Sequence, residues 1–137
     1  MRKTTILALA IAAGLLTTFG CSSSSEATIS GTVTYRQRIS LPDDSIITVQ
    51  LQDVSRADIA ATVLGEQIIK TDGQQVPIPY QVTYDELEID DRFSYSMSAR
   101  IVDGTGKLLF ISDTHKPVIT RDNPTKDVEI VVVPVAP

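Results

Sequence analysis

Apolar and polar residues alternate along most of the chain after residue 27, and this period of two constrains the fold more than any other feature. The run 93–101 shows it most clearly, and 28–35 and 47–52 follow the same pattern. Successive side chains of a β-strand point to opposite faces, so such alternation predicts a strand with one buried face. No segment has a convincing amphipathic helical pattern. We therefore predict an all-β fold.

Frequent turn residues divide the runs into seven or eight short strands, which is typical of an antiparallel β-sandwich. The segment 103–107 contains two glycines and predicts a hairpin loop. Pro77 and Pro79 donate no backbone hydrogen bond, which places the start of their strand at a sheet edge. The segment 131–133 is apolar on both sides, so we expect a central strand or one covered on both faces. The strands are expected near 28–35, 47–52, 61–70, 76–84, 93–101, 108–112, 118–120 and 128–135.

The amino-terminal residues have the layout of a secretory signal peptide. Two basic residues precede the apolar stretch 6–16, which is shorter than the about 20 residues of a membrane span. Cys21, the only cysteine, follows a small residue, and this arrangement resembles the lipobox of bacterial lipoproteins, where the thiol is lipidated and the chain is cleaved before it. Thr18 stands where most lipoboxes carry leucine. An uncleaved anchor and an incidental thiol are the alternatives.

Three segments are expected: a signal peptide over 1–20, lipidated Cys21 with a serine-rich tether over 21–26, and a β-sandwich domain over 27–137. The domain contains no cysteine and therefore forms no disulfide. Apolar packing must stabilise it. Several acyl chains on one cysteine make a permanent membrane anchor. We therefore expect the bilayer to be a partner through Cys21.

The charge balance excludes some partners. Without residues 1–20 the chain keeps ten basic and seventeen acidic residues, a formal charge near −7. A negative surface argues against nucleic acid and against electrostatic adhesion to anionic lipid. Attachment to a membrane must then come from the lipid on Cys21.

Few residues are candidates for catalysis or metal binding. His115, the only histidine, lies too close in sequence to Ser112 and Asp113 for a Ser-His-Asp arrangement, and no nucleophile elbow is present. The acidic segment 85–91 does not match a calcium loop, and 84–91 is expected to form either one helical turn or a solvated connection. We predict no catalytic residue, cofactor or metal site. The tyrosines and Phe93 are expected to pack in the core; an aromatic platform for glycans is the alternative. The aromatic residues concerned are Tyr35, Tyr80, Tyr84, Phe93 and Tyr95.

The stretch Gly31-Thr-Val-Thr-Tyr-Arg-Gln-Arg-Ile-Ser-Leu-Pro42 opens a set of residues that spans nearly the whole domain. Together these residues resemble the YbaY/YscW-type lipoproteins. The residue types that carry the resemblance are structural rather than catalytic. The other matching residues are 49–55, Asp58, 76–80, Tyr84-Asp85, Ile89-Asp90, Arg92, 99–101, 108–110, Asp113 and 117–120.

The resemblance implies a β-sandwich on an outer-membrane lipid anchor, with the domain facing the periplasm. One branch of the family contains type III secretion pilotins, which bind a secretin subunit and assist its assembly. It therefore implies a non-enzymatic envelope chaperone whose partner is a secretin or another outer-membrane protein. No motif identifies the partner-binding residues. The alternatives are a stand-alone lipoprotein that binds a small molecule or glycan, and a hydrolase that uses His115.

Overall fold

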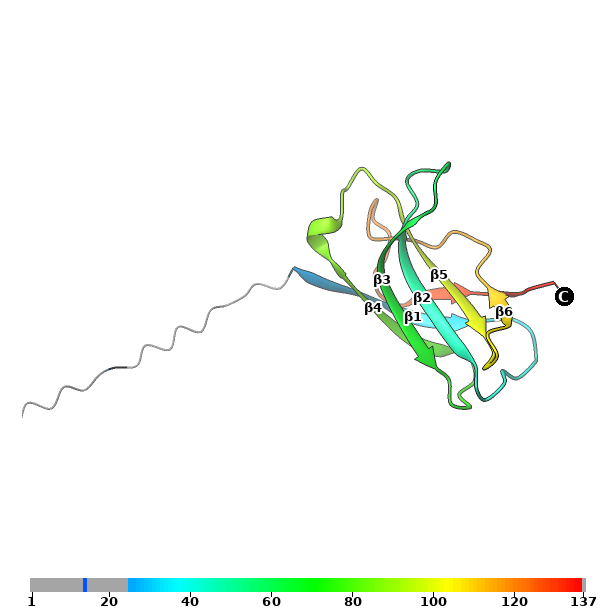
Figure 1. Ribbon diagram of the computed structural model, residues 1–137. Coiled ribbons are helices and arrows are strands. Elements are labelled where there is room, and N and C mark those ends of the chain that lie inside the picture. Colours follow the sequence, from blue (N-terminus) through cyan, green and yellow to red (C-terminus); the bar gives the residue numbers. More distant parts are fainter. Residues whose placement is uncertain (1–13, 15–24, 137) are drawn as a thin grey trace, which may run out of the picture.

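The structure, a computed structural model, describes residue 14 and residues 25–136. Within these residues the chain forms two packed sheets and a single turn of 3-10 helix, and none of its helices is long and apolar enough to span a membrane (Figure 1). The elements are β1 (Glu26–Thr34), β2 (Ile46–Asp53), β3 (Thr62–Lys70), β4 (Ile78–Asp85), η1 (Glu86–Glu88), β5 (Tyr95–Val102), β6 (Leu108–Ile111), β7 (Pro117–Val118), β8 (Val128–Val131) and β9 (Val133–Pro134).

The smaller sheet has the strand order β4-β1-β8, and the larger has the order β3-β2-β5-β6-β9, with β7 also paired to β5. All pairs are antiparallel except β1 with β8, which is parallel. The pairing of β2 with both β3 and β5 places it inside the larger sheet. The strand β4 is at an edge of the smaller sheet, as its prolines predict.

The core lies between the two sheets and is made of the alternating apolar residues that the sequence pattern identified. Inward side chains of β1, β2, β4 and β5 are almost fully buried, and the intervening ones are half-buried or exposed, apart from the buried Ser96. One ring pair, Tyr35 and Phe110, stacks with centroids 4.4 Å apart. The largest fully buried side chains are Tyr95, Ile29, Ile47, Leu51, Ile78, Met97, Ile101 and Ile130.

Gly31 lets the three strands of the smaller sheet pack closely. It pairs with Tyr80 on β4 and with Val128 on β8, and a Cβ atom at this position would collide with the Val128 backbone. With that space free, the buried Tyr80 hydroxyl crosses the sheet and donates to the Val128 carbonyl oxygen at 2.8 Å. Gly31 falls at an ordinary position of the alternating run 28–35, but the structure requires glycine there because there is no space for a side chain.

The β-sandwich is confirmed, with differences in detail. The nine strands exceed the expected seven or eight, and the parallel β1–β8 pair departs from a purely antiparallel sandwich. The last expected strand divides at buried Val132, whose N–H donates to the Thr34 carbonyl oxygen, so the chain passes from one sheet to the other there. The central position expected for 131–133 is therefore wrong: these residues are apolar because they connect the edges of two sheets.

Two further strand boundaries differ from the prediction. Phe93 precedes β5 instead of opening it, and 40% of its surface is exposed, so its expected place in the core is wrong. The strand β7 stops at Val118 because Ile119 adopts a positive φ of 71°, which cannot continue a strand. The turn expected within 84–91 is present as η1.

Candidate partner-binding site at the amino-terminal end

The domain begins at a fixed junction between Ser25 and the end of β4. The Ser25 hydroxyl donates to Asp85 Oδ1 at 2.6 Å, and the Glu86 N–H donates to the Ser25 carbonyl oxygen at 2.8 Å. The same Asp85 oxygen accepts from the Leu87 N–H at 2.9 Å and so caps η1. The Ser25 hydroxyl, and then the Leu87 N–H, hold the pKa of Asp85 below its usual range. Ser25, one residue before β1, is therefore already fixed to the domain.

A cleft opens beside this junction, between the edges of the two sheets. The strands β3 and β4 lie side by side there, but the described residues form no ladder between them (Figure 1). The cleft has a volume of about 480 Å³. Its lining is polar and acidic apart from Leu64. The lining residues are Ser25, Glu26, Leu64, Thr83, Tyr84, Asp85 and Glu88.

The edge of β4 is blocked along its first half, whereas its second half borders the cleft. Pro79 has no N–H to offer, and the N–H of Gln81 is taken by the Gln67 side-chain oxygen of β3 at 2.6 Å. Alternation along the strand turns the N–H of Thr83 to the same edge. Thr83 also lines the cleft, so the half of the edge that borders the cleft is the half next to Ser25, with the Thr83 carbonyl oxygen close to Gly65 of β3.

Gly65 holds the two edges together just beyond the cleft. An added Cβ atom would lie 2.5 Å from the Thr83 carbonyl oxygen and 2.8 Å from Val82 Cγ1. Only glycine allows β3 to approach β4 this closely, and β3 carries a bulge beside Gly65, where Leu64 is the extra residue opposite Leu51/Gln52 of β2. The width of the cleft therefore depends on this position.

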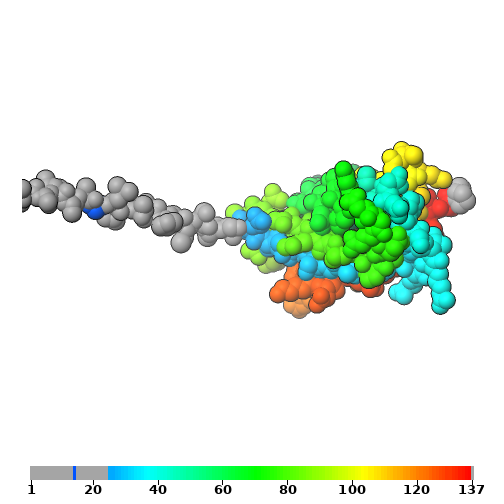
Figure 2. All heavy atoms as spheres, turned by 90° about the horizontal axis from the view of Figure 1, so that it is seen from below, coloured from blue at the N-terminus to red at the C-terminus, as the bar shows by residue number. Residues whose placement is uncertain are grey.

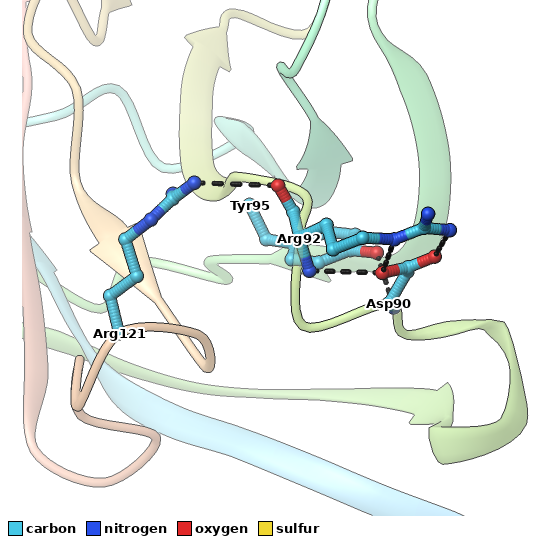
Figure 3. A network of polar contacts seen from close by, with 4 residues as sticks. All are labelled: Asp90, Arg92, Tyr95 and Arg121. Carbon is cyan, nitrogen blue, oxygen red and sulfur yellow. Dashed lines mark hydrogen bonds and ion pairs between the residues drawn. The ribbon is translucent and has the colours of Figure 1, made fainter.

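A second polar network closes the loop before β5 (Figure 3). Arg92 forms a two-pronged ion pair with Asp90 at 2.7 and 3.0 Å, and the Arg92 hydrogen bonds lower the pKa of Asp90 to about 2. The Asp90 N–H donates to the Tyr95 hydroxyl at 2.9 Å, and Arg121 donates to the Arg92 carbonyl oxygen at 3.4 Å and to Ser94. Each polar group here is used to shape a turn, which makes the network structural.

Cys21, the predicted lipidation site, lies outside the described residues. Ser25 is four positions after it. The cleft and the Ser25–Asp85 junction thus lie at the end of the domain nearest the expected anchor.

His115 lies in the exposed loop before β7, and the described residues offer it no hydrogen-bonding or ionic partner. The neighbouring hydroxyls are used by the backbone: Ser112 accepts from the Ala99 N–H at 3.1 Å, and Ser96 accepts from the Lys116 N–H at 3.1 Å. A nucleophile must be within hydrogen-bond reach of its base, and these groups are not so arranged. The geometry does not favour the hydrolase hypothesis.

The acidic segment 85–91 is divided between different tasks. Asp85 caps η1 and holds Ser25, whereas Asp90 pairs with Arg92. Among residue 14 and residues 25–136, no three potential ligands are grouped closely enough to hold a metal ion. The segment is a connection whose carboxylates shape two turns.

The four tyrosines are buried, and their burial argues against the alternative of an aromatic platform for glycans. Tyr35, Tyr80, Tyr84 and Tyr95 each expose less than a tenth of their surface. Burial raises the pKa of Tyr80 well above its usual range. A glycan-binding platform made of these four rings is therefore excluded.

Sequence reasoning did not find the cleft or the role of Ser25. The alternating pattern predicts strands and faces, but it does not predict which edges from different sheets meet. Ser25 looked like the last residue of a flexible run. One sequence feature could have predicted this turn: Asp85 lies two residues before Leu87, a spacing typical of a side chain that caps a turn.

These features define a class: a small β-sandwich domain whose amino-terminal end carries a polar cleft between two sheet edges. A family model described as "Type III secretion system lipoprotein chaperone (YscW)" matches residues 24–130. The chain belongs to this YscW family, as the residue-level resemblance indicated.

Two relatives agree with this assignment. The chain is 35% identical over 105 residues to a protein of Escherichia coli (strain K12) described as "Uncharacterized lipoprotein YbaY", which covers 77% of the chain and 55% of the relative. The chain thus spans about half the length of this curated relative. An alternative pilotin from the type II secretion system of Vibrio cholerae has a solved structure that matches with a TM-score of 0.77 and 44% identity, over 82% of this chain and 99% of the pilotin. The family is one of lipoprotein chaperones and pilotins, not a family of enzymes.

Proposed function

We propose that this protein is a non-enzymatic envelope chaperone, anchored to the outer membrane through acylated Cys21, that binds another envelope protein. In this proposal residues 1–20 are removed as a signal peptide and the domain faces the periplasm. The tether is shorter than the expected 21–26 and ends at residue 24, because Ser25 is bonded to Asp85 and β1 begins at Glu26. The observation that carries it is the match to a chaperone family model over 24–130 together with the match to a pilotin over 82% of the chain. A secretin subunit is the foremost candidate partner.

The cleft between β3 and β4 is the surface that fits such a partner best. An extended segment can add to the half of the β4 edge that borders the cleft by main-chain hydrogen bonds, the mode of strand addition. Glu26, Asp85 and Glu88 line the cleft, so charge complementarity favours a segment that carries lysine or arginine. The blocked half, with Pro79 and the Gln67–Gln81 contact, limits addition to a few residues.

Photocrosslinking in intact envelopes tests this proposal. A photoreactive amino acid is placed at Thr83 in the cleft, and separately at exposed Ile39 beyond the other end of β1. The Thr83 position should give a crosslink to one defined envelope protein, identified by mass spectrometry, and the Ile39 position should not. A Cys21→Ser form should lose the crosslink if membrane anchoring brings the partner close.

The outcomes separate the function from the surface. If no position on the domain captures a protein partner under several growth conditions, the chaperone function is wrong. If Ile39 captures the partner and Thr83 does not, the function stands and the cleft is not the binding surface.

A further inference from the structure

The short helix η1 presents the most exposed large apolar side chain of the described residues. Leu87 exposes 84% of its surface, against 62% for Ile68, the next in order. It lies between Glu86 and Glu88 at the tip of the turn that follows β4. A single exposed leucine on a protein surface needs no special explanation. Leu87, however, lies close to the tether, and this position gives a reason for its exposure.

Leu87 is joined to Ser25 through one carboxylate oxygen. Asp85 Oδ1 accepts from the Ser25 hydroxyl at 2.6 Å and from the Leu87 N–H at 2.9 Å. The Leu87 nitrogen and the Ser25 hydroxyl oxygen are therefore no more than the sum of these two distances apart. A second bond, from the Glu86 N–H to the Ser25 carbonyl oxygen, fixes the same junction from the backbone side.

The length of the tether then limits how far Leu87 can be from the membrane. Four residue steps separate Cys21 from Ser25, and four steps span at most about 14 Å. The root-mean-square span of such a linker is about 10–12 Å. A lipidated Cys21 lies at the bilayer surface. The tether therefore keeps η1 close to the hydrocarbon core, at a distance no greater than about the depth of the headgroup region plus one tether length. This proximity gives a weak apolar contact a high effective concentration.

The charges around Leu87 determine the kind of bilayer. Glu86 and Glu88 flank it, and Asp85 and Asp91 lie nearby, whereas Asp90 is paired with Arg92. An anionic surface would repel this segment over a Debye length of about 8–10 Å. A zwitterionic surface would not repel the segment. The flanking carboxylates can stay hydrated at the bilayer surface while the leucine enters the headgroup region.

We propose that Leu87 inserts into the headgroup region of a zwitterionic bilayer, so that the η1 end of the domain rests on the membrane. This inference rests on the proposed lipidation of Cys21. It gives the domain one orientation on the membrane, with the β3–β4 cleft close to the surface and the loop at 36–41 directed away. In Figure 2 the blue start of β1 and the red carboxy-terminal residues lie at opposite ends of the domain.

The absence of tryptophan from the sequence makes a direct test possible. Leu87→Trp, Thr28→Trp and Ile39→Trp are each prepared as the lipidated full-length protein in vesicles of brominated phosphatidylcholine, which quenches tryptophan on contact. Thr28 is exposed on β1 near the tether but on the outer face of the smaller sheet, and Ile39 is exposed beyond the far end of β1. Because tryptophan itself prefers membrane interfaces, Thr28→Trp is the matched control. We expect strong quenching for Leu87→Trp and little for the other two.

Equal quenching of Leu87→Trp and Thr28→Trp, or no quenching of Leu87→Trp, would overturn the proposal. Intact mass and vesicle flotation of the same samples report lipidation separately, so a failed anchor is distinguished from a domain that does not rest on the bilayer. An eight-residue glycine-serine insertion after Ser23 should reduce the quenching of Leu87→Trp, and unchanged quenching would contradict the role of the short tether. Replacing half of the lipid with phosphatidylglycerol should also reduce it at low salt; an increase would contradict the charge argument.

Discussion

At the scale of single residues, the fold depends on a few side chains that join strands across a sheet or close a turn. Tyr80 crosses Gly31 to reach the Val128 carbonyl oxygen, and Arg92 closes its turn on Asp90. Neither interaction could be predicted from alternation alone, because each depends on the partner that tertiary structure brings opposite. Each interaction leads to a prediction about the titration of one of its side chains.

The Tyr80→Phe variant should be less stable than the wild type, with a difference that depends on pH. Removal of the hydroxyl leaves a buried carbonyl oxygen without this donor, a loss of about 1–3 kcal/mol in the free energy of unfolding. Because burial raises the pKa of Tyr80, the folded chain keeps the proton while the unfolded chain loses it above about pH 10. The stability due to Tyr80 is thus full below that pH and declines above it. Urea denaturation at pH 7 and pH 11 should show the difference narrowing; a constant difference would contradict this assignment.

The carboxyl group of Asp90 should titrate near pH 2. Its hydrogen bonds from Arg92 lower its pKa to about 2, so the stabilisation is present above the usual aspartate range and is lost as the pH falls through about 2. Carbon-13 NMR of the aspartate side chains measures this directly. In Arg92→Gln the pKa should rise towards its ordinary value, whereas Arg100→Gln, on the outer face of β5, should leave it unchanged. A pKa of Asp90 that does not respond to Arg92→Gln would show that another group controls it.

At the scale of strands, the period of two predicts most of the fold, and the failures have physical causes. It locates β1, β2, β4 and β5 because each has one buried face, whereas β3 has only half-buried and exposed side chains and β6 has one buried side chain. It does not show that the chain changes sheets at Val132, since a segment buried by two sheets in turn looks like one buried central strand. It also places Phe93 in β5, although the Asp90–Arg92 turn precedes the strand. The cleft was beyond prediction because it depends on where two edges meet.

Gly65 tests how closely β3 must approach β4. In Gly65→Ala the new Cβ atom meets backbone, which cannot rotate away, so the edges must separate. We expect a loss of about 1–3 kcal/mol in the free energy of unfolding, as for other overpacked sites. Chemical denaturation checks this value, and Thr62→Ala on the exposed start of the same strand should change stability by no more than about 0.5 kcal/mol. A Gly65→Ala variant as stable as Thr62→Ala would show that the strands are free to move apart.

At the scale of the whole molecule, three features coincide at one end of the domain: Ser25, the half of the β4 edge that borders the cleft, and the exposed Leu87. Asp85 lines the cleft and accepts hydrogen bonds from Ser25 and Leu87, so it fixes the positions of both relative to the cleft. In the function that we propose, this arrangement would place the binding surface of an anchored chaperone next to the bilayer.

The account depends most on Cys21, because anchoring, orientation and access to an envelope partner all follow from its lipidation. Intact mass spectrometry of the protein purified from the membrane fraction tests this claim most directly. We predict a mature chain that lacks residues 1–20 and begins at Cys21 with an added diacylglyceryl group and an amide-linked acyl chain. A chain that retains residues 1–20, or that carries an unmodified thiol at Cys21, would contradict the account of its function while leaving the β-sandwich intact.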